Sequence, residues 1–159
     1  MNNQRLPKFL IIGATFLVAM LLMLIPLPDW AQPWRPEWLA VTLIYWSMAL
    51  PKNVSIGIAW TLGLCVDVIH GTLLGQYALG FAITAYLAIH FHIQARNYPL
   101  YQQAIFVGII LLPYMGVSLW VLGILGEDPK SWLYWAPILT SILVWPFVYL
   151  ALRAIRRAC

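Results

Sequence analysis

The chain has 159 residues, of which 63% are hydrophobic and only 9% charged, with a net charge of +4 and a mean hydropathy of +0.83. Soluble domains carry about 25% charged residues, so the composition excludes an ordinary soluble domain. The basic residues are spread thinly between apolar segments, which excludes the concentrated positive patch of a nucleic-acid-binding protein. The composition therefore predicts an integral membrane protein in contact with the lipid bilayer, and its long apolar segments predict an all-α fold.

Six apolar segments lie between polar breaks, and each suits a membrane-spanning helix of about 20 residues. They cover residues 8–25, 36–50, 54–70, 76–93, 99–125 and 131–154 and form one membrane domain. The first has the basic flank of a signal peptide, but no small-residue cleavage site follows Ile25, so we expect a retained span. Pro36 suits the first position of the second helix, where a missing N–H loses no intrahelical bond.

Lysine and arginine residues are concentrated in alternate breaks between these segments. Cytoplasmic loops of membrane proteins carry an excess of both residues, and this bias predicts that both termini are cytoplasmic. An even number of spans requires the same result. One side carries Arg5, Lys8, Lys52, Arg96, Arg153, Arg156 and Arg157, and the other carries Arg35 and Lys130.

The third segment ends in an ionisable pair, Asp67 and His70, within the stretch GLCVDVIHGTLLGQYALG. Residues three apart share a helix face. Asp67 lies about 20 Å along a helix that begins near Val54, at a rise of 1.5 Å per residue, which places it in the outer half of the membrane. A lone aspartate there costs at least about 2.5 kcal/mol, so it should face protein and accept hydrogen bonds. Candidate donors are His70, Thr61, Thr72 and backbone N–H groups at the start of the fourth helix.

Two roles remain open for Asp67 and His70: a structural pin between the third and fourth helices, and a proton relay or ligand site. Catalysis is disfavoured, because Cys65 points about 200° away from Asp67 around a helix and no serine lies in a recognisable nucleophile elbow. His90 and His92 project about 200° apart, which suits interfacial packing better than a shared metal. We therefore expect no enzyme activity, no cofactor and no metal.

Gly63, Gly71 and Gly75 fall in steps of eight and four residues, with Asp67 at the midpoint of the longer step. Small residues at four-residue spacing let membrane helices approach closely. Gly71 and Gly75 also flank a three-residue stretch, which predicts a tight hairpin between the third and fourth helices. Packing within the chain explains these glycines better than dimerisation does.

The run of Gly63, Asp67, Gly71 and Gly75, followed by YALGFAITAYL, resembles the MreD family of rod shape-determining proteins. Three further segments resemble that family in the same order along the chain. The similarity covers nearly the whole chain and is weakest over residues 106–135. The three segments are PLPDW (residues 26–30), WRPEWLAVTLIYWSMALP (residues 34–51, with Arg35 and Pro36 at the start of the second helix) and ILVWPFVYLALRAIRRA (residues 142–158).

This resemblance implies a non-enzymatic scaffold in the bacterial inner membrane that helps maintain rod shape and organise peptidoglycan synthesis. Its implied partner is the bitopic protein MreC, with a RodA-type glycosyltransferase, a penicillin-binding transpeptidase and, indirectly, the MreB filament. The family is also similar in architecture to the six-helix substrate-binding subunits of energy-coupling-factor transporters. That likeness leaves a small-molecule- or lipid-binding membrane protein as the alternative function.

Overall fold

The computed structural model describes residues 8–26, 28–31, 34–52, 54–71, 74–126 and 132–158, and over these residues all regular structure is helical. This confirms the predicted all-α class. Among the described helices, two, α6 and α7, are long and apolar enough to cross a membrane. The described helices are α1 (Lys8–Leu24), α2 (Trp38–Ala49), α3 (Ile56–His70), α4 (Gln76–His90), α5 (His92–Arg96), α6 (Leu100–Ile124) and α7 (Ala136–Ala158), with a 3-10 turn, η2, over Trp132–Trp135.

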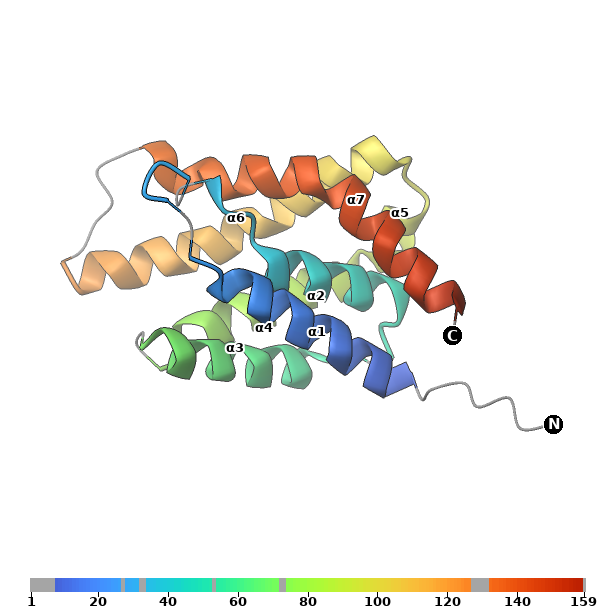
Figure 1. Cartoon of the computed structure of the whole chain (residues 1–159), viewed down its shortest axis with the longest axis horizontal. Coiled ribbons are helices and arrows are strands. Elements are labelled where there is room, and N and C mark those ends of the chain that lie inside the picture. The colour runs from blue at the N-terminus through green and yellow to red at the C-terminus, as the bar shows by residue number, and fades with distance from the viewer. Residues whose placement is uncertain are drawn as a thin grey trace.

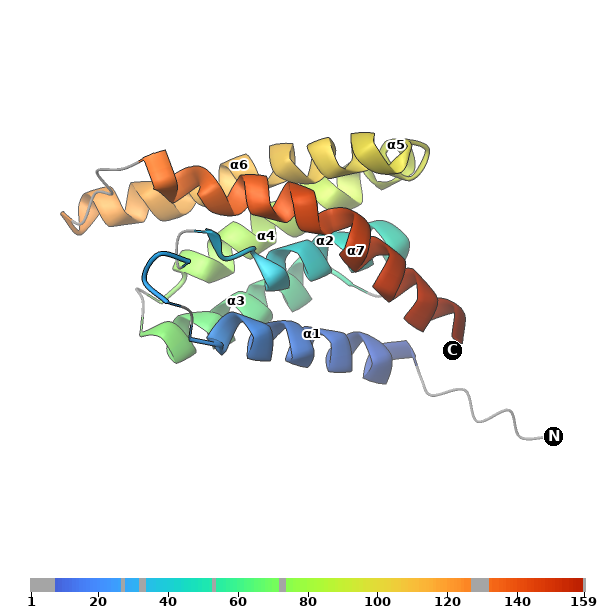
Figure 2. The same ribbon diagram turned by 45° about the horizontal axis from the view of Figure 1, so that its top comes forward.

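The long helices run back and forth along one axis. The start of α1 and the end of α7 lie at one end of the bundle, together with the short helix α5 (Figure 1). The helices α1, α3 and α6 all end at the opposite end, where α7 begins (Figures 1 and 2). The pairs α1–α2, α3–α4 and α6–α7 pack against each other, and the most extensive contact joins α3 to α4.

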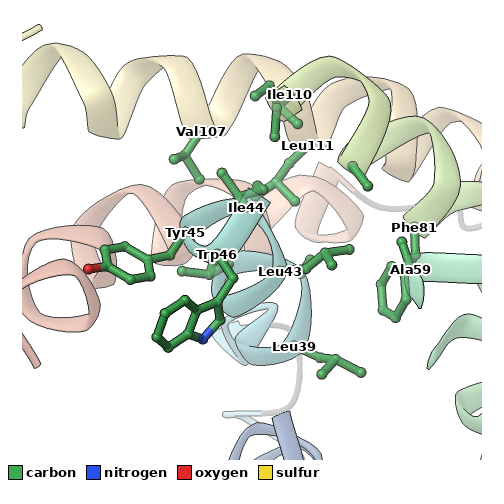
Figure 3. Close-up of a cluster of buried hydrophobic side chains, with 14 of the residues drawn as sticks. Leu39, Leu43, Ile44, Tyr45, Trp46, Ala59, Phe81, Val107, Ile110 and Leu111 are labelled. Carbon is green, nitrogen blue, oxygen red and sulfur yellow. The ribbon is translucent and has the colours of Figure 1, made fainter. Parts of the chain in front are cut away.

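Helix α2 lies at the centre and packs against α1, α4, α5, α6 and α7. All ten residues from Leu39 to Met48 are buried, as expected for a helix that is apolar on every side. Figure 3 shows Ile44 pointing toward α6 and Tyr45 toward α7. With 12 residues, α2 is about 18 Å long, shorter than the ~30 Å hydrocarbon core. Its neighbours shield it from lipid, which allows irregular backbone at its ends.

Helix α1 is attached to this centre by one face. Ile12, Phe16, Ala19 and Met23 form a buried stripe at helical spacing, and α1 packs mainly against α2. The Trp46 indole N–H donates to the Thr15 hydroxyl at 2.8 Å. The opposite face of α1 is apolar and exposed, which suits contact with lipid.

The clearest differences from the predicted segments are in α2, α4 and α7. Helix α7 covers Ala136–Ala158 rather than 131–154, and a 3-10 turn over Trp132–Trp135 precedes it. Helix α2 begins at Trp38 rather than at Pro36, because the residue between them has a non-helical backbone and bonds to other helices. The fourth segment, predicted as 76–93, divides at Phe91 into α4 and α5. The Gln103 side-chain amide donates to the Ala95 carbonyl at 3.0 Å, which holds α5 against the start of α6.

Candidate functional site

Asp67 lies in the last turn of α3 and is 1% exposed. Its carboxylate accepts hydrogen bonds from the backbone N–H groups of Gly75 at 2.8 Å, Tyr77 at 2.9 Å and Ala78 at 3.5 Å. The first N–H groups of a helix have no intrahelical acceptor, and they favour a negative charge. Of the candidate donors named from the sequence, the backbone N–H groups at the start of α4 form these bonds. They join the end of α3 to the first turn of α4.

The three glycines around Asp67 each meet a specific requirement. Gly71 ends α3 with a φ of +66° and Gly75 precedes α4 with a φ of +103°, a region that favours glycine. Gly63 faces α4 so closely that an added Cβ atom would lie 2.3 Å from the Ala78 Cα atom. Glycine therefore sets both the turn and the separation of the two helices.

His70 lies in different surroundings from Asp67. Its ring is exposed, with Nδ1 3.3 Å from the Val66 carbonyl oxygen and its centroid 5.5 Å from that of Tyr77. Cys65 is also exposed. The structure thus separates a buried carboxylate from an imidazole on the surface of the bundle.

His90 and His92 lie at the other end of α4, where His90 ends α4 and His92 begins α5. The His90 ring stacks on Tyr86 with centroids 5.8 Å apart, and His92 Nδ1 lies beside the Ile89 carbonyl. Within the described ranges, no three His, Cys, Asp or Glu side chains gather as metal ligands.

Glu37 is a site residue that the sequence reasoning missed. Its carboxylate accepts a hydrogen bond from the Tyr114 hydroxyl at 3.2 Å, and its backbone N–H donates to the Ser141 hydroxyl at 3.0 Å. Glu37 therefore joins the start of α2 to the middle of α6 and to α7. The available signal was an acid directly before a long apolar run.

Arg35, singled out from the sequence by resemblance alone, bonds to the end of α1. Its guanidinium donates to the Met23 carbonyl at 2.6 Å and to the Ile25 carbonyl. The last carbonyls of a helix have no intrahelical donor and favour a positive charge. The guanidinium also attracts the Glu37 carboxylate. Pro36, between them, is partly buried and precedes the helix.

Aromatic rings connect the two acidic sites. The Tyr77 backbone bonds Asp67, and its ring centroid lies 6.3 Å from that of Tyr114, whose hydroxyl bonds Glu37. Tyr114 also stacks on Phe81 with centroids 5.5 Å apart and planes at 16°. We call Asp67, Tyr77, Tyr114, Glu37 and Arg35 the acidic network. Its bonds and ring contacts reach α1, α2, α3, α4 and α6, so its chemistry fixes helices relative to one another.

A family model for the rod shape-determining protein MreD matches residues 3–155 of the chain. The chain belongs to the MreD family. The rod shape-determining protein MreD of Haemophilus influenzae is 32% identical over 160 residues, which cover 99% of this chain and 97% of that relative. No solved structure matches the chain.

Membership of the MreD family confirms the resemblance found in the four sequence segments. It associates the chain with the membrane and with cell shape, and the two apolar helices α6 and α7 fit membrane insertion. MreD is a shape-determining family and is not known as an enzyme family. The acidic network therefore lies within a membrane protein of a shape-determining family.

Proposed function

We propose that this chain is a non-enzymatic scaffold of the cell-wall elongation complex in the bacterial inner membrane. In this role it binds an MreC-like bitopic protein and helps organise peptidoglycan synthesis by a RodA-type glycosyltransferase and a penicillin-binding transpeptidase, with an indirect connection to MreB. The observation that carries the proposal is the family match over nearly the whole chain. The acidic network supports it, because its charged groups bond to the chain's own backbone and side chains.

The proposed topology has six spans, formed by α1, α2, α3, α4, α6 and α7, with both termini in the cytoplasm. One end of the bundle holds the start of α1, the short helix α5 and the end of α7 (Figure 1), and the segments at this end contain most of the basic residues. A cytoplasmic assignment of that end follows from the positive-inside rule. The acidic network then lies in the outer half of the membrane. The basic side chains of the described residues at this end are Lys8, Lys52, Arg96, Arg153, Arg156 and Arg157.

A partner with one spanning helix has suitable surfaces on this bundle. Membrane helices associate through van der Waals packing of small and apolar side chains, with few charges at the contact. The outward faces of α1, α6 and α7 are apolar and exposed. They match the chemistry of a bitopic partner's spanning helix.

The alternative, a transporter-like small-molecule binder, needs an accessible polar site near Asp67. The Asp67 carboxylate is 1% exposed and accepts bonds from three backbone N–H groups. This arrangement favours a structural pin over a ligand site, so we place the scaffold first.

Depletion of the chain in the bacterium that encodes it tests the proposed function. We expect rod-shaped cells to become round, and re-expression of the chain from a second copy to restore the rods. The positions of newly incorporated wall material, followed with a fluorescent D-amino acid, should lose their pattern along the cell sides. Rods that persist after full depletion would lead us to abandon the scaffold role.

A further inference from the structure

Three arginines from two helices line one small cavity at the end of the bundle where the chain begins and ends. The cavity has a volume of about 160 Å³, and Arg96 of α5 and Arg153 and Arg156 of α7 contribute to its wall. Tyr45 of α2, Gln103 of α6 and Tyr149 of α7 complete the polar lining. Guanidinium groups present several donors in a planar fork, the geometry that binds phosphate oxygens.

Two buried polar atoms of the residues that line this cavity have no hydrogen-bond partner among the described residues. The Tyr45 hydroxyl and the Gln103 side-chain carbonyl oxygen are unbonded, although the two residues are only 3% and 4% exposed. The Gln103 amide nitrogen is fixed by its bond to the Ala95 carbonyl. Buried polar groups nearly always have partners. A phosphate oxygen would accept from Tyr45, and a head-group hydroxyl would donate to Gln103.

No aspartate or glutamate of the sequence belongs to the segments that form this end. Cation–π contacts give the arginines partial compensation, since Arg153 and Arg156 each lie 6.0 Å from a tyrosine ring centroid. An anion from outside the chain would complete the neutralisation. The five acidic residues lie between α1 and α2 (Asp29 and Glu37), at the end of α3 (Asp67) and between α6 and α7 (Glu127 and Asp128).

An apolar groove leads away from the same basic end. It lies between α1 and α7 with α2 as its floor, and has a volume of about 920 Å³ with an almost entirely apolar lining. Leu10 and Phe147 are among its exposed walls. Ile11 lines both this groove and a smaller cavity of about 170 Å³ that also contacts Lys8 and Arg156. The smaller cavity therefore lies between the apolar groove, which it meets at Ile11, and the Arg156 guanidinium.

We propose that this end of the bundle binds an anionic phospholipid, with acyl chains along the α1–α7 groove and its phosphate against Arg153, Arg156 and Arg96. Basic pockets between membrane helices on the cytoplasmic side bind anionic head groups in general. A glycerol-bearing head group, as in phosphatidylglycerol, supplies both the phosphate oxygens and the hydroxyl that the buried atoms lack. The site requires a membrane protein but not the scaffold role, so its failure and that of the proposed function are independent.

Native mass spectrometry of the full chain, released from nanodiscs, tests the site. We expect retained phosphatidylglycerol and little phosphatidylcholine when both are supplied equally. Each basic side chain that contacts the head group contributes about a fivefold gain in affinity, so R153Q together with R156Q should weaken retention by about 25-fold. R153K together with R156K should keep most of it. R157Q removes an exposed arginine outside the cavity lining and should leave retention unchanged.

Several results would overturn the lipid site. If phosphatidylcholine were retained as well as phosphatidylglycerol, the charge of the head group would not determine binding. The same would follow if R157Q weakened retention as much as R153Q together with R156Q. If inorganic phosphate alone displaced the lipid, the cavity would be a site for a soluble anion.

The groove is tested separately with A151W, which places an indole in its wall, and with L150W on the adjacent exposed surface as control. We expect weaker retention only in A151W. A photoreactive side chain at Ala151 in native membranes should crosslink to lipid. Crosslinking there to a protein would assign the groove to a partner's helix and overturn the proposal.

Discussion

Replacement of Asp67 by alanine removes a carboxylate that joins α3 to α4. Two of its backbone bonds are short, from Gly75 at 2.8 Å and from Tyr77 at 2.9 Å, and the third, from Ala78, is long at 3.5 Å. A hydrogen bond to a charged group contributes about 1.5–3 kcal/mol, so the two short bonds together contribute about 3–6 kcal/mol. D67A also leaves these partly buried N–H groups without that acceptor.

Thermal unfolding of the purified chain in detergent, followed by tryptophan fluorescence, measures this loss. For a chain of this size each kcal/mol shifts the midpoint by about 2–4 °C, so a loss of ~3 kcal/mol lowers it by at least about 6 °C. D67N keeps one carbonyl oxygen as acceptor and should fall between D67A and the parent. H70A changes an exposed ring on the same turn and should shift the midpoint by less than about 2 °C.

A D67A midpoint equal to that of the parent would refute the structural reasoning. If such a variant also failed to support rod shape, Asp67 would have a direct role in binding or proton transfer. A fall in H70A as large as in D67A would show that the two side chains act as one unit.

Three other substitutions test neighbouring contacts. G63A places a Cβ atom against α4 and should lose about 1–3 kcal/mol from overpacking, whereas G116A, with open space at its Cβ position, should gain up to about 1 kcal/mol of helix propensity in the same unfolding assay. Y114F removes the donor to the acid before α2 and should lose about 1.5–3 kcal/mol, while Y101F at the exposed surface of α6 should stay within about 0.5 kcal/mol. R35Q removes two charge-assisted bonds and should raise amide hydrogen exchange in the last turn of α1, while exchange in the middle of α6 stays unchanged. Equal shifts in a variant and its control, or unchanged exchange in R35Q, would contradict these assignments.

The helices and the α3–α4 hairpin could be predicted because local signals define them. Long apolar runs require helices in lipid, and Gly71 and Gly75 mark positions where only a left-handed backbone closes the turn. The close approach at Gly63 followed from small-residue spacing. Asp67 stood out because a charge inside an apolar run needs a partner within the protein.

The role of Glu37 could not be predicted, because its partners are distant in sequence. Its bonds go to Tyr114 and Ser141, 77 and 104 residues away, and neither contact has a local signature. The late start of α2 has the same cause, since these bonds hold the Glu37 backbone outside the helix. His70 was grouped with Asp67 by spacing, but a three-residue step on a helix places side chains about 60° apart. That angle is enough to bury the aspartate while the histidine ring stays exposed.

The scaffold role is tested most directly by purification of the tagged chain from native membranes in mild detergent, with quantitative mass spectrometry of the proteins that accompany it. We expect an MreC-like bitopic protein at a constant stoichiometry, and we expect D67A to lower the amount of both proteins together. A chain that is recovered folded, in full amount and without any bitopic membrane protein would contradict the proposed scaffold.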